Sequence, residues 1–119
     1  MHKFTGTVKK SAGRGRKLGF PTANIDVPDD APEGIFFALT TVGGKRYPSL
    51  FFIGRAMTFD EDDKRGEAYL LDFEADLYGE EIIVRIVEKY RENIKFDSRE
   101  QLIRQMQDDR LAAKEYFGI

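Results

Sequence analysis

Two adjacent glycines, Gly43 and Gly44, separate two segments that have the composition of β-strands. The first segment, Gly34–Val42, is rich in aromatic and β-branched residues, and Lys45–Ile53 is predicted as its partner strand. A two-glycine turn favours a β-hairpin, because glycine accepts the positive φ angles that tight hairpin turns need. Pro48 predicts an edge or a bulge in the second strand, since proline cannot donate a ladder hydrogen bond.

Three further segments predict strands. Lys3–Lys9 alternates apolar and polar residues, and Glu67–Phe73 and Glu81–Arg91 flank a turn near Asp76–Gly79. Residues 10–33 are rich in Gly, Pro and Asp and are predicted as one long connection. Connections of that length inside a compact domain tend to be functional.

The end of the chain has helical features. Ser98 and Gln101 form a capping box, and the predicted helix runs to about residue 115. Its expected apolar face consists of Leu102, Ile103, Met106 and Leu111. The acidic stretch Asp60–Gly66 is interpreted as a solvated loop. Five or more strands with one late helix favour a closed antiparallel barrel, with a two-sheet sandwich as the alternative.

The length and composition limit the class of protein. The 119 residues fit one domain, which we expect to span 1–119, and a hydrophobic fraction of 41% can build a core. The chain has no cysteine and no apolar run long enough to span a membrane. Met1–Phe4 leads directly into an alternating pattern without an apolar signal region, so we expect a cytoplasmic protein.

Charge is unevenly distributed along the chain. Residues 1–25 contain six cations and no acid, whereas residues 60–92 contain twelve acids against five bases. This polarity predicts an anionic ligand near the first segment, or simply two solvated faces of opposite sign.

Gly13–Asn24, with the sequence GRGRKLGFPTAN, carries the most chemical information. Its glycines allow backbone N–H groups to approach an anion, and its cations complement phosphate oxygens. Thr22 and Asn24 are two residues apart, so an extended backbone points both side chains to the same side, where their oxygens are suitable Mg²⁺ ligands. The residues alone leave two other interpretations open, a nucleic-acid contact loop and a plain surface loop.

The string Gly15–Asn24, GRKLGFPTAN, closely resembles the signature of the riboflavin kinase family. Further matches follow in the family's order along nearly the whole chain. They are Gly34-Ile35-Phe36, Ile53-Gly54, Thr58-Phe59, Glu67, Leu70-Leu71-Asp72-Phe73, Asp76-Leu77-Tyr78-Gly79, Arg91 and Phe96-Asp97-Ser98.

The resemblance implies a mainly β fold, a six-stranded antiparallel closed barrel of the riboflavin kinase type with one C-terminal α-helix. It implies transfer of the γ-phosphate of ATP to the 5′-hydroxyl of riboflavin, giving FMN and ADP. Thr22 and Asn24 correspond to the residues that hold Mg²⁺, and Glu67 corresponds to the catalytic base. The remaining implied contacts are to nucleotide, from Gly13, Gly15, Arg16, Lys17, Thr22, Asn24, Tyr69 and Phe73, and to flavin, from Arg91 and Phe96.

The implied chemistry agrees with the residues present. Phosphoryl transfer needs positioning, a metal to neutralise phosphate charge and a base for the attacking hydroxyl. A glutamate is ionised at pH 7 and can accept that proton. Tyr69, Phe73 and Tyr78 are expected at an adenine pocket or, alternatively, in ordinary barrel packing.

The chain departs from the family pattern at several positions. Phe52 replaces a small polar residue, Met57 replaces a proline, and Tyr69 replaces a frequent histidine. The family's Arg-Pro-Glu in the flavin segment is here Arg91-Glu92-Asn93. The phosphate and metal motif is intact, which supports nucleotide binding. The departures bear on flavin specificity and leave open a relative that phosphorylates or only binds another molecule.

Two other functions are consistent with a small barrel: a flavin or nucleotide sensor without turnover, and a single-stranded nucleic-acid binder. The overall acidity of the chain opposes a polyanionic partner. We therefore expect a monomer that binds riboflavin or FMN and ATP or ADP, without nucleic acid or membrane partners.

Overall fold

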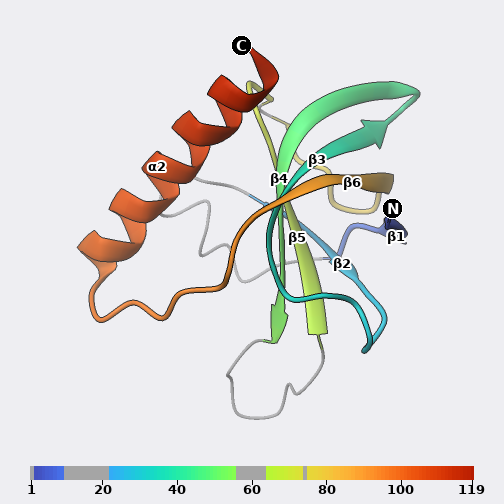
Figure 1. The fold of residues 1–119 in the computed structure, drawn as a ribbon. Coiled ribbons are helices and arrows are strands. Elements are labelled where there is room, and N and C mark those ends of the chain that lie inside the picture. Colours follow the sequence, from blue (N-terminus) through green and yellow to red (C-terminus); the bar gives the residue numbers. More distant parts are fainter. Residues whose placement is uncertain (1, 10–21, 56–63, 74) are drawn as a thin grey trace.

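The computed structural model describes residues 2–9, 22–55, 64–73 and 75–119. Six antiparallel strands form one sheet that curls into a nearly closed barrel, and one long helix lies along its outside (Figure 1). The elements are β1 Lys3–Thr7, β2 Ala23–Asp26, β3 Gly34–Val42, β4 Lys45–Arg55, β5 Lys64–Leu70, β6 Glu81–Arg91 and α2 Arg99–Phe117. This architecture confirms the predicted fold class.

The strand order is β1-β6-β3-β4-β5-β2, so the two edges of the sheet are β1 and β2. They meet at a bridge between Lys9 and Asn24, where the Lys9 N–H donates to the Asn24 carbonyl at 2.8 Å. The side chain of Lys9 also pairs with Asp26, at 2.5 Å. This seam brings the sheet close to closure.

Strand β2 corrects the prediction of one long connection over residues 10–33. Ala23–Asp26 pairs along its whole length with β5. Its sequence, ANID, contains three residues that are uncommon in strands, so local propensity does not indicate a strand. The pairing with β5 is what makes this segment extended.

Strand β5 also differs from the prediction. It begins at Lys64 rather than Glu67 and ends at Leu70, because Asp72 turns the chain with a φ of 53°. Lys64 is buried and donates hydrogen bonds to the carbonyls of Asp29 and Ala31, at 2.7 and 2.6 Å. The end of the segment predicted as a solvated loop, Asp60–Gly66, is therefore ordered strand.

The hairpin prediction is confirmed. Gly43 and Gly44 have φ angles of 56° and 82° between the paired strands β3 and β4. Pro48 lies on an inner strand rather than at an edge of the sheet, but residues 45–48 of β4 pair with β3 and have no register partner on β5. Because Pro48 has no register partner on β5, the N–H that proline lacks removes no hydrogen bond between β4 and β5.

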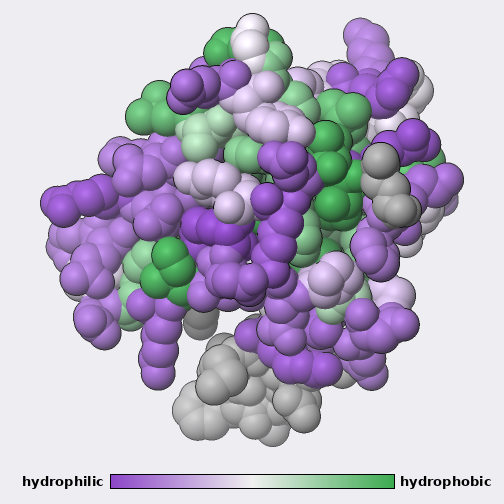
Figure 2. Space-filling view, in the orientation of Figure 1, coloured by the Kyte–Doolittle hydropathy of each residue, from purple (hydrophilic) through white to green (hydrophobic). Residues whose placement is uncertain are grey.

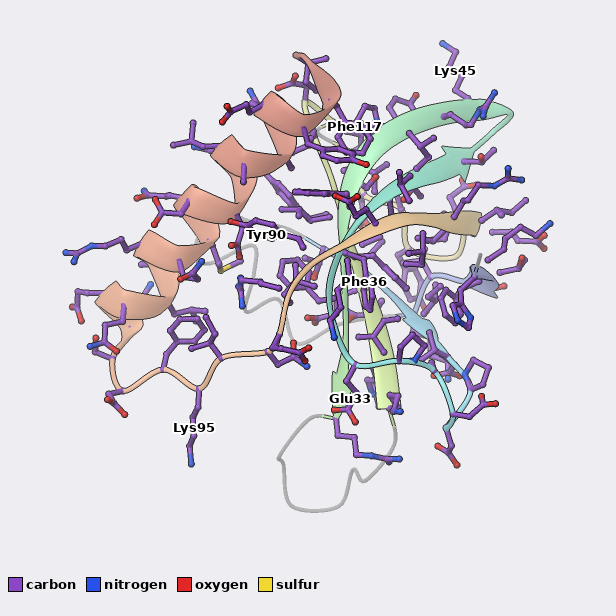
Figure 3. All side chains as sticks on the ribbon, in the orientation of Figure 1. Glu33, Phe36, Lys45, Tyr90, Lys95 and Phe117 are labelled. Atoms are coloured by element: carbon purple, nitrogen blue, oxygen red, sulfur yellow. The ribbon has the colours of Figure 1, made fainter. Side chains whose placement is uncertain are left out.

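Two apolar clusters hold the fold. Inside the barrel lie residues such as Phe4, Ile25, Phe36, Phe51 and Ile82. Between the sheet and α2 lies a second cluster, in which Figure 3 shows Tyr90 from β6 and Phe117 from the end of α2 on the side of the helix that faces the sheet. Its members are Ile35, Phe37, Leu50, Leu71 and Ala113, with Phe52, Tyr69, Tyr90, Ala112 and Phe117 packed against them.

Helix α2 begins after Ser98, whose side chain accepts a hydrogen bond from the Gln101 N–H, as the capping box predicts. Its outward side is largely hydrophilic (Figure 2). Leu111 is 63% exposed and does not belong to the buried face, whereas Asp109 and Ala113 are buried. No helix in the described ranges is both long and apolar enough to span a membrane.

Candidate active site

Asn24 in β2 lies directly opposite Glu67 in β5 in the antiparallel register. Side chains at opposed positions lie on the same face of a sheet, with Cβ atoms about 4.5–5.5 Å apart. The next pair along, Ala23 and Ala68, belongs to the cluster inside the barrel. Because side chains alternate along a strand, Asn24 and Glu67 face outward.

Gly66, which precedes Glu67 in β5, packs closely against the core of the barrel. A Cβ on Gly66 would lie 2.4 Å from the ring of Phe51, which is fully buried. Only glycine lets β5 approach the barrel interior this closely. The register that sets Glu67 opposite Asn24 is therefore supported by packing on the inner face.

The environments of the two side chains differ. Asn24 is 6% exposed and Glu67 is exposed. Thr22, half-buried, lies immediately before β2 and two residues from Asn24. The segment Thr22–Asn24 and the opposing carboxylate thus supply a hydroxyl, an amide oxygen and a carboxylate.

These oxygen donors fit Mg²⁺, which is usually held by few protein ligands together with waters and substrate phosphates. Among the described residues no group of three or more His, Cys, Asp or Glu side chains could hold a metal by itself. A site built mainly by protein carboxylates is therefore absent from that part of the chain. A site completed by nucleotide phosphates suits the residues present.

The row that begins with Asn24 and Glu67 continues across three more strands. Glu67 lies opposite Phe52 in β4, Phe52 opposite Ile35 in β3, and Ile35 opposite Arg91 in β6. With strands about 4.8 Å apart, Arg91 begins about 14 Å from Glu67 along this row. Asn24, predicted to contact the nucleotide, and Arg91, predicted to contact the flavin, therefore lie on one outer face.

Arg91 is held by helix α2. Its Nε and Nη2 donate to the two carboxylate oxygens of Asp109, at 2.9 and 2.5 Å, and Gln105 also donates to Asp109. Asp109 is fully buried, and the Arg91 side chain is 16% exposed. Burial raises the pKa of the neighbouring Tyr90 phenol, and the Asp109 carboxylate raises it further. The pair is a structural connection between β6 and α2, which sequence patterns did not indicate.

A small pocket of about 130 Å³ lies where β5 and its following turn meet α2. It is lined by Tyr69, Leu70, Asp72, Phe73, Arg110 and Lys114. The pocket brings together the two aromatic residues predicted for the nucleotide and adds two cations from the helix. Lys114 pairs with Asp72 at 3.1 Å. The lining therefore combines two aromatic rings with two cations and one carboxylate.

Sequence reasoning missed the pocket's cations, Arg110 and Lys114. Their only signal is that they are four residues apart, on one side of a helix. Tyr78, expected near the adenine, is 61% exposed and does not line this pocket. Phe96 is half-buried in the segment between β6 and α2.

The predicted phosphate-binding residues Gly13, Gly15, Arg16 and Lys17 lie outside the described residues. The family matches Thr58 and Phe59 and the departure at Met57 lie outside them as well.

Curated relatives resemble most of this chain. It is 41% identical over 111 residues to the RNA-binding riboflavin kinase RibR of Bacillus subtilis, covering 92% of this chain and 48% of the relative. It is 36% identical over 117 residues to the bifunctional riboflavin kinase/FMN adenylyltransferase of Listeria monocytogenes, covering 95% and 37%. The chain thus spans less than half the length of these relatives.

Solved structures share the fold. One described as a macrolide-efflux protein from Streptococcus pneumoniae matches with a TM-score of 0.83 and 30% identity, over 94% of this chain and 38% of that one. The riboflavin kinase of Trypanosoma brucei matches with a TM-score of 0.65 and 22% identity, over 98% and 79%. The model of the riboflavin kinase (flavokinase) family matches residues 1–117, from before β1 to the last residue of α2, and the chain therefore belongs to the riboflavin kinase family.

Proposed function

We propose that this chain transfers the γ-phosphate of ATP to the 5′-hydroxyl of riboflavin, releasing FMN and ADP. Membership of the riboflavin kinase family supports the reaction type. The observation that carries the proposal is the outward-facing pair of Asn24 and Glu67, which sets an exposed carboxylate opposite a buried amide on the outer face of the sheet. That arrangement offers a base beside a group that can hold metal-bound phosphates.

In the proposed reaction the Glu67 carboxylate accepts the proton of the riboflavin hydroxyl. The hydroxyl oxygen forms a bond to the γ-phosphorus while the bond from that phosphorus to the β–γ bridging oxygen breaks. ADP leaves with the electron pair of the broken bond. Exposure of Glu67 on the outer face leaves it accessible to an incoming hydroxyl.

Thr22 and Asn24 are the residues proposed to hold Mg²⁺, which when bound neutralises the charge of the nucleotide phosphates. Gly13, Gly15, Arg16 and Lys17 are proposed as further phosphate contacts through backbone N–H groups and cationic side chains. The intact Gly15–Asn24 string supports this assignment.

Tyr69 and Phe73 are proposed to contact the adenine in the pocket that they line. Tyr69 follows Glu67 on the same face of β5, about 7 Å along the strand, so one extended nucleotide can reach both. Phe96 and the exposed part of Arg91 are proposed to contact the flavin. The Arg91 guanidinium otherwise binds Asp109.

We further propose that residues 1–119 act as one domain, as a monomer in the cytoplasm, without a nucleic-acid partner. The large exposed apolar residues are Tyr78 before β6, Ile94 after β6, and Leu111, Tyr116 and Ile119 in or just beyond α2. The net charge of −2 opposes a nucleic-acid partner.

Incubation with riboflavin, ATP and Mg²⁺, followed by chromatographic separation of flavins, tests the proposal. We expect FMN and ADP in equal amounts, and no FMN once the metal is chelated. Absence of FMN with every nucleotide and divalent ion tried would contradict it. If the protein still bound both ligands, it would be a sensor rather than a kinase.

A further inference from the structure

Asn93 ties the segment between β6 and α2 to a strand of the barrel. Its Nδ2 donates to the carbonyl of Ile53 in β4, at 3.0 Å. The segment, residues 92–98, leaves the sheet after β6 and turns back into α2 (Figure 1). Lys95, two residues beyond Asn93, points away from the helix (Figure 3).

Gly54 provides the space for this amide. A Cβ on Gly54 would lie 3.1 Å from Asn93 Nδ2, which is closer than ordinary van der Waals contact. The Asn93 side chain therefore lies over the backbone of Gly54, where other strand residues carry a side chain. The φ of Gly54 lies outside the region that favours glycine, so an alanine there is tolerated by the backbone.

This contact lies next to the candidate base. Phe52 is directly opposite Glu67, and Gly54 is two residues further along the same face of β4. A diagonal neighbour of this kind lies about 7–8 Å away. Asn93 thus covers the strand on the β4 side of Glu67.

The two flanks of Glu67 differ in chemistry. The β2 flank carries Asn24 and Thr22, the proposed metal and phosphate ligands. The β4 flank carries Phe52 and, over Gly54, the Asn93 side chain, three residues before the half-buried Phe96. A base that acts between the phosphate donor and the phosphate acceptor must have the nucleotide on one flank and the flavin on the other.

We propose that Asn93 is a positioning residue for the acceptor flavin, which it serves by anchoring the start of the segment 92–98 at Ile53 and Gly54 of β4. The inference rests on the proposed riboflavin kinase function. The donated hydrogen bond is specific to the amide, because a carboxylate, as in the family's Arg-Pro-Glu, cannot donate to the Ile53 carbonyl. This chain therefore holds its flavin segment by a contact of its own.

The test compares Asn93→Asp with the parent protein. The two side chains have nearly the same shape, but the acid replaces a donor with a second acceptor facing the carbonyl. We expect the KM for riboflavin and the Kd from riboflavin fluorescence to rise about threefold to tenfold, the loss expected for one hydrogen bond. The KM for ATP and the melting temperature should stay at the parental values. Ile94→Ala, at the exposed neighbouring residue, is the matched control.

Gly54→Ala perturbs the same contact from the other side. Its Cβ displaces the Asn93 amide, so the riboflavin Kd should rise without a change for ATP. In the Asn93→Ala background that Cβ has nothing to displace, and Gly54→Ala should then add less than about twofold.

Any of three results would overturn the proposal. They are additive effects of Gly54→Ala and Asn93→Ala on the riboflavin Kd, an equal loss of affinity for ATP, and a parental riboflavin Kd in Asn93→Asp. A parent that binds riboflavin but makes no FMN refutes the kinase function, and the Kd comparison then still decides the role of Asn93. A parent that does not bind riboflavin overturns both.

Discussion

Arg91 and Asp109 join the last residue of β6 to the middle of α2 by two hydrogen bonds that use both carboxylate oxygens. Because Asp109 is fully buried, Arg91→Leu leaves an uncompensated charge beneath the helix. We expect the free energy of unfolding in urea to fall by about 3 kcal/mol.

The exposed pair of Lys89 and Glu92 offers a control for this experiment. Lys89→Met should change stability by less than about 0.5 kcal/mol. Arg91→Leu combined with Asp109→Leu should recover part of the loss, because no buried charge remains. Equal stability of Arg91→Leu and the parent would show that the pair contributes nothing to the folded state.

Glu67→Gln tests the proposed base. The amide keeps the shape of the side chain and one acceptor but cannot take the proton of the hydroxyl. We expect kcat to fall by about a hundredfold to ten-thousandfold, with the affinities for riboflavin and MgATP little changed. Single-turnover FMN formation and fluorescence titration on the same sample measure both. Glu88→Gln, an exposed carboxylate on β6, should keep parental kcat.

Thr22→Ala removes one proposed Mg²⁺ ligand at the start of β2. We expect the Mg²⁺ concentration that gives half-maximal activity to rise about tenfold and the KM for ATP to rise with it, while the melting temperature stays near the parental value. A Mg²⁺ titration at fixed ATP measures the shift. Thr5→Ala, on the exposed side of β1, is the control, and an unchanged titration in Thr22→Ala would remove Thr22 from the metal site.

Gly66→Ala tests the packing that sets the position of Glu67. Its Cβ would lie 2.4 Å from the Phe51 ring and 3.0 Å from Val27, so the core must shift. We expect a loss of about 1–3 kcal/mol in the free energy of unfolding, typical of overpacking. Phe51→Leu should recover stability in the Gly66→Ala background but reduce it in the parent. Simple addition of the two losses would exclude a direct clash.

Tyr90 provides a pH test. Its raised pKa means that the folded state holds the phenol proton more tightly than the unfolded chain does. The associated stability is present below the ordinary tyrosine pKa of about 10 and is lost as pH rises through the higher folded value. Urea unfolding from pH 8 to 11 should therefore show a smaller decline for Tyr90→Phe than for the parent. Parallel curves would exclude a contribution from Tyr90.

The sequence predicted elements whose signals are local. The Gly43-Gly44 turn, β6 and the Ser98 cap were predicted where the structure has them. Strand β2 was missed because its four residues become a strand only through pairing with β5, a contact between segments about 40 residues apart. The start of β5 was misplaced for the same reason.

The site shows the same division. The string that contains Thr22 and Asn24 and the position of Glu67 were recognisable from the resemblance, but their direct opposition depends on the register of β2 against β5. The hydrophobic pattern predicts Leu111 on the buried face of the helix, whereas the structure exposes Leu111 and buries Asp109. A hydrophobic pattern cannot reveal this, because the burial of Asp109 depends on its pairing with Arg91. The pocket cations on α2 depend on the docking of the helix, which local patterns do not specify.

The bridge between Lys9 and Asn24 makes the barrel's seam a candidate for local opening. On one side β2 is held by a four-residue ladder, and on the other its described backbone pairing with the β1 end is this one bridge, beside the ion pair of Lys9 with Asp26. Short, sparsely bonded edges exchange their amide hydrogens through sub-global fluctuations more readily than central strands do. A ligand that binds Asn24 therefore stabilises the closed seam, so the amide of Lys9 should become more protected from exchange when nucleotide is bound.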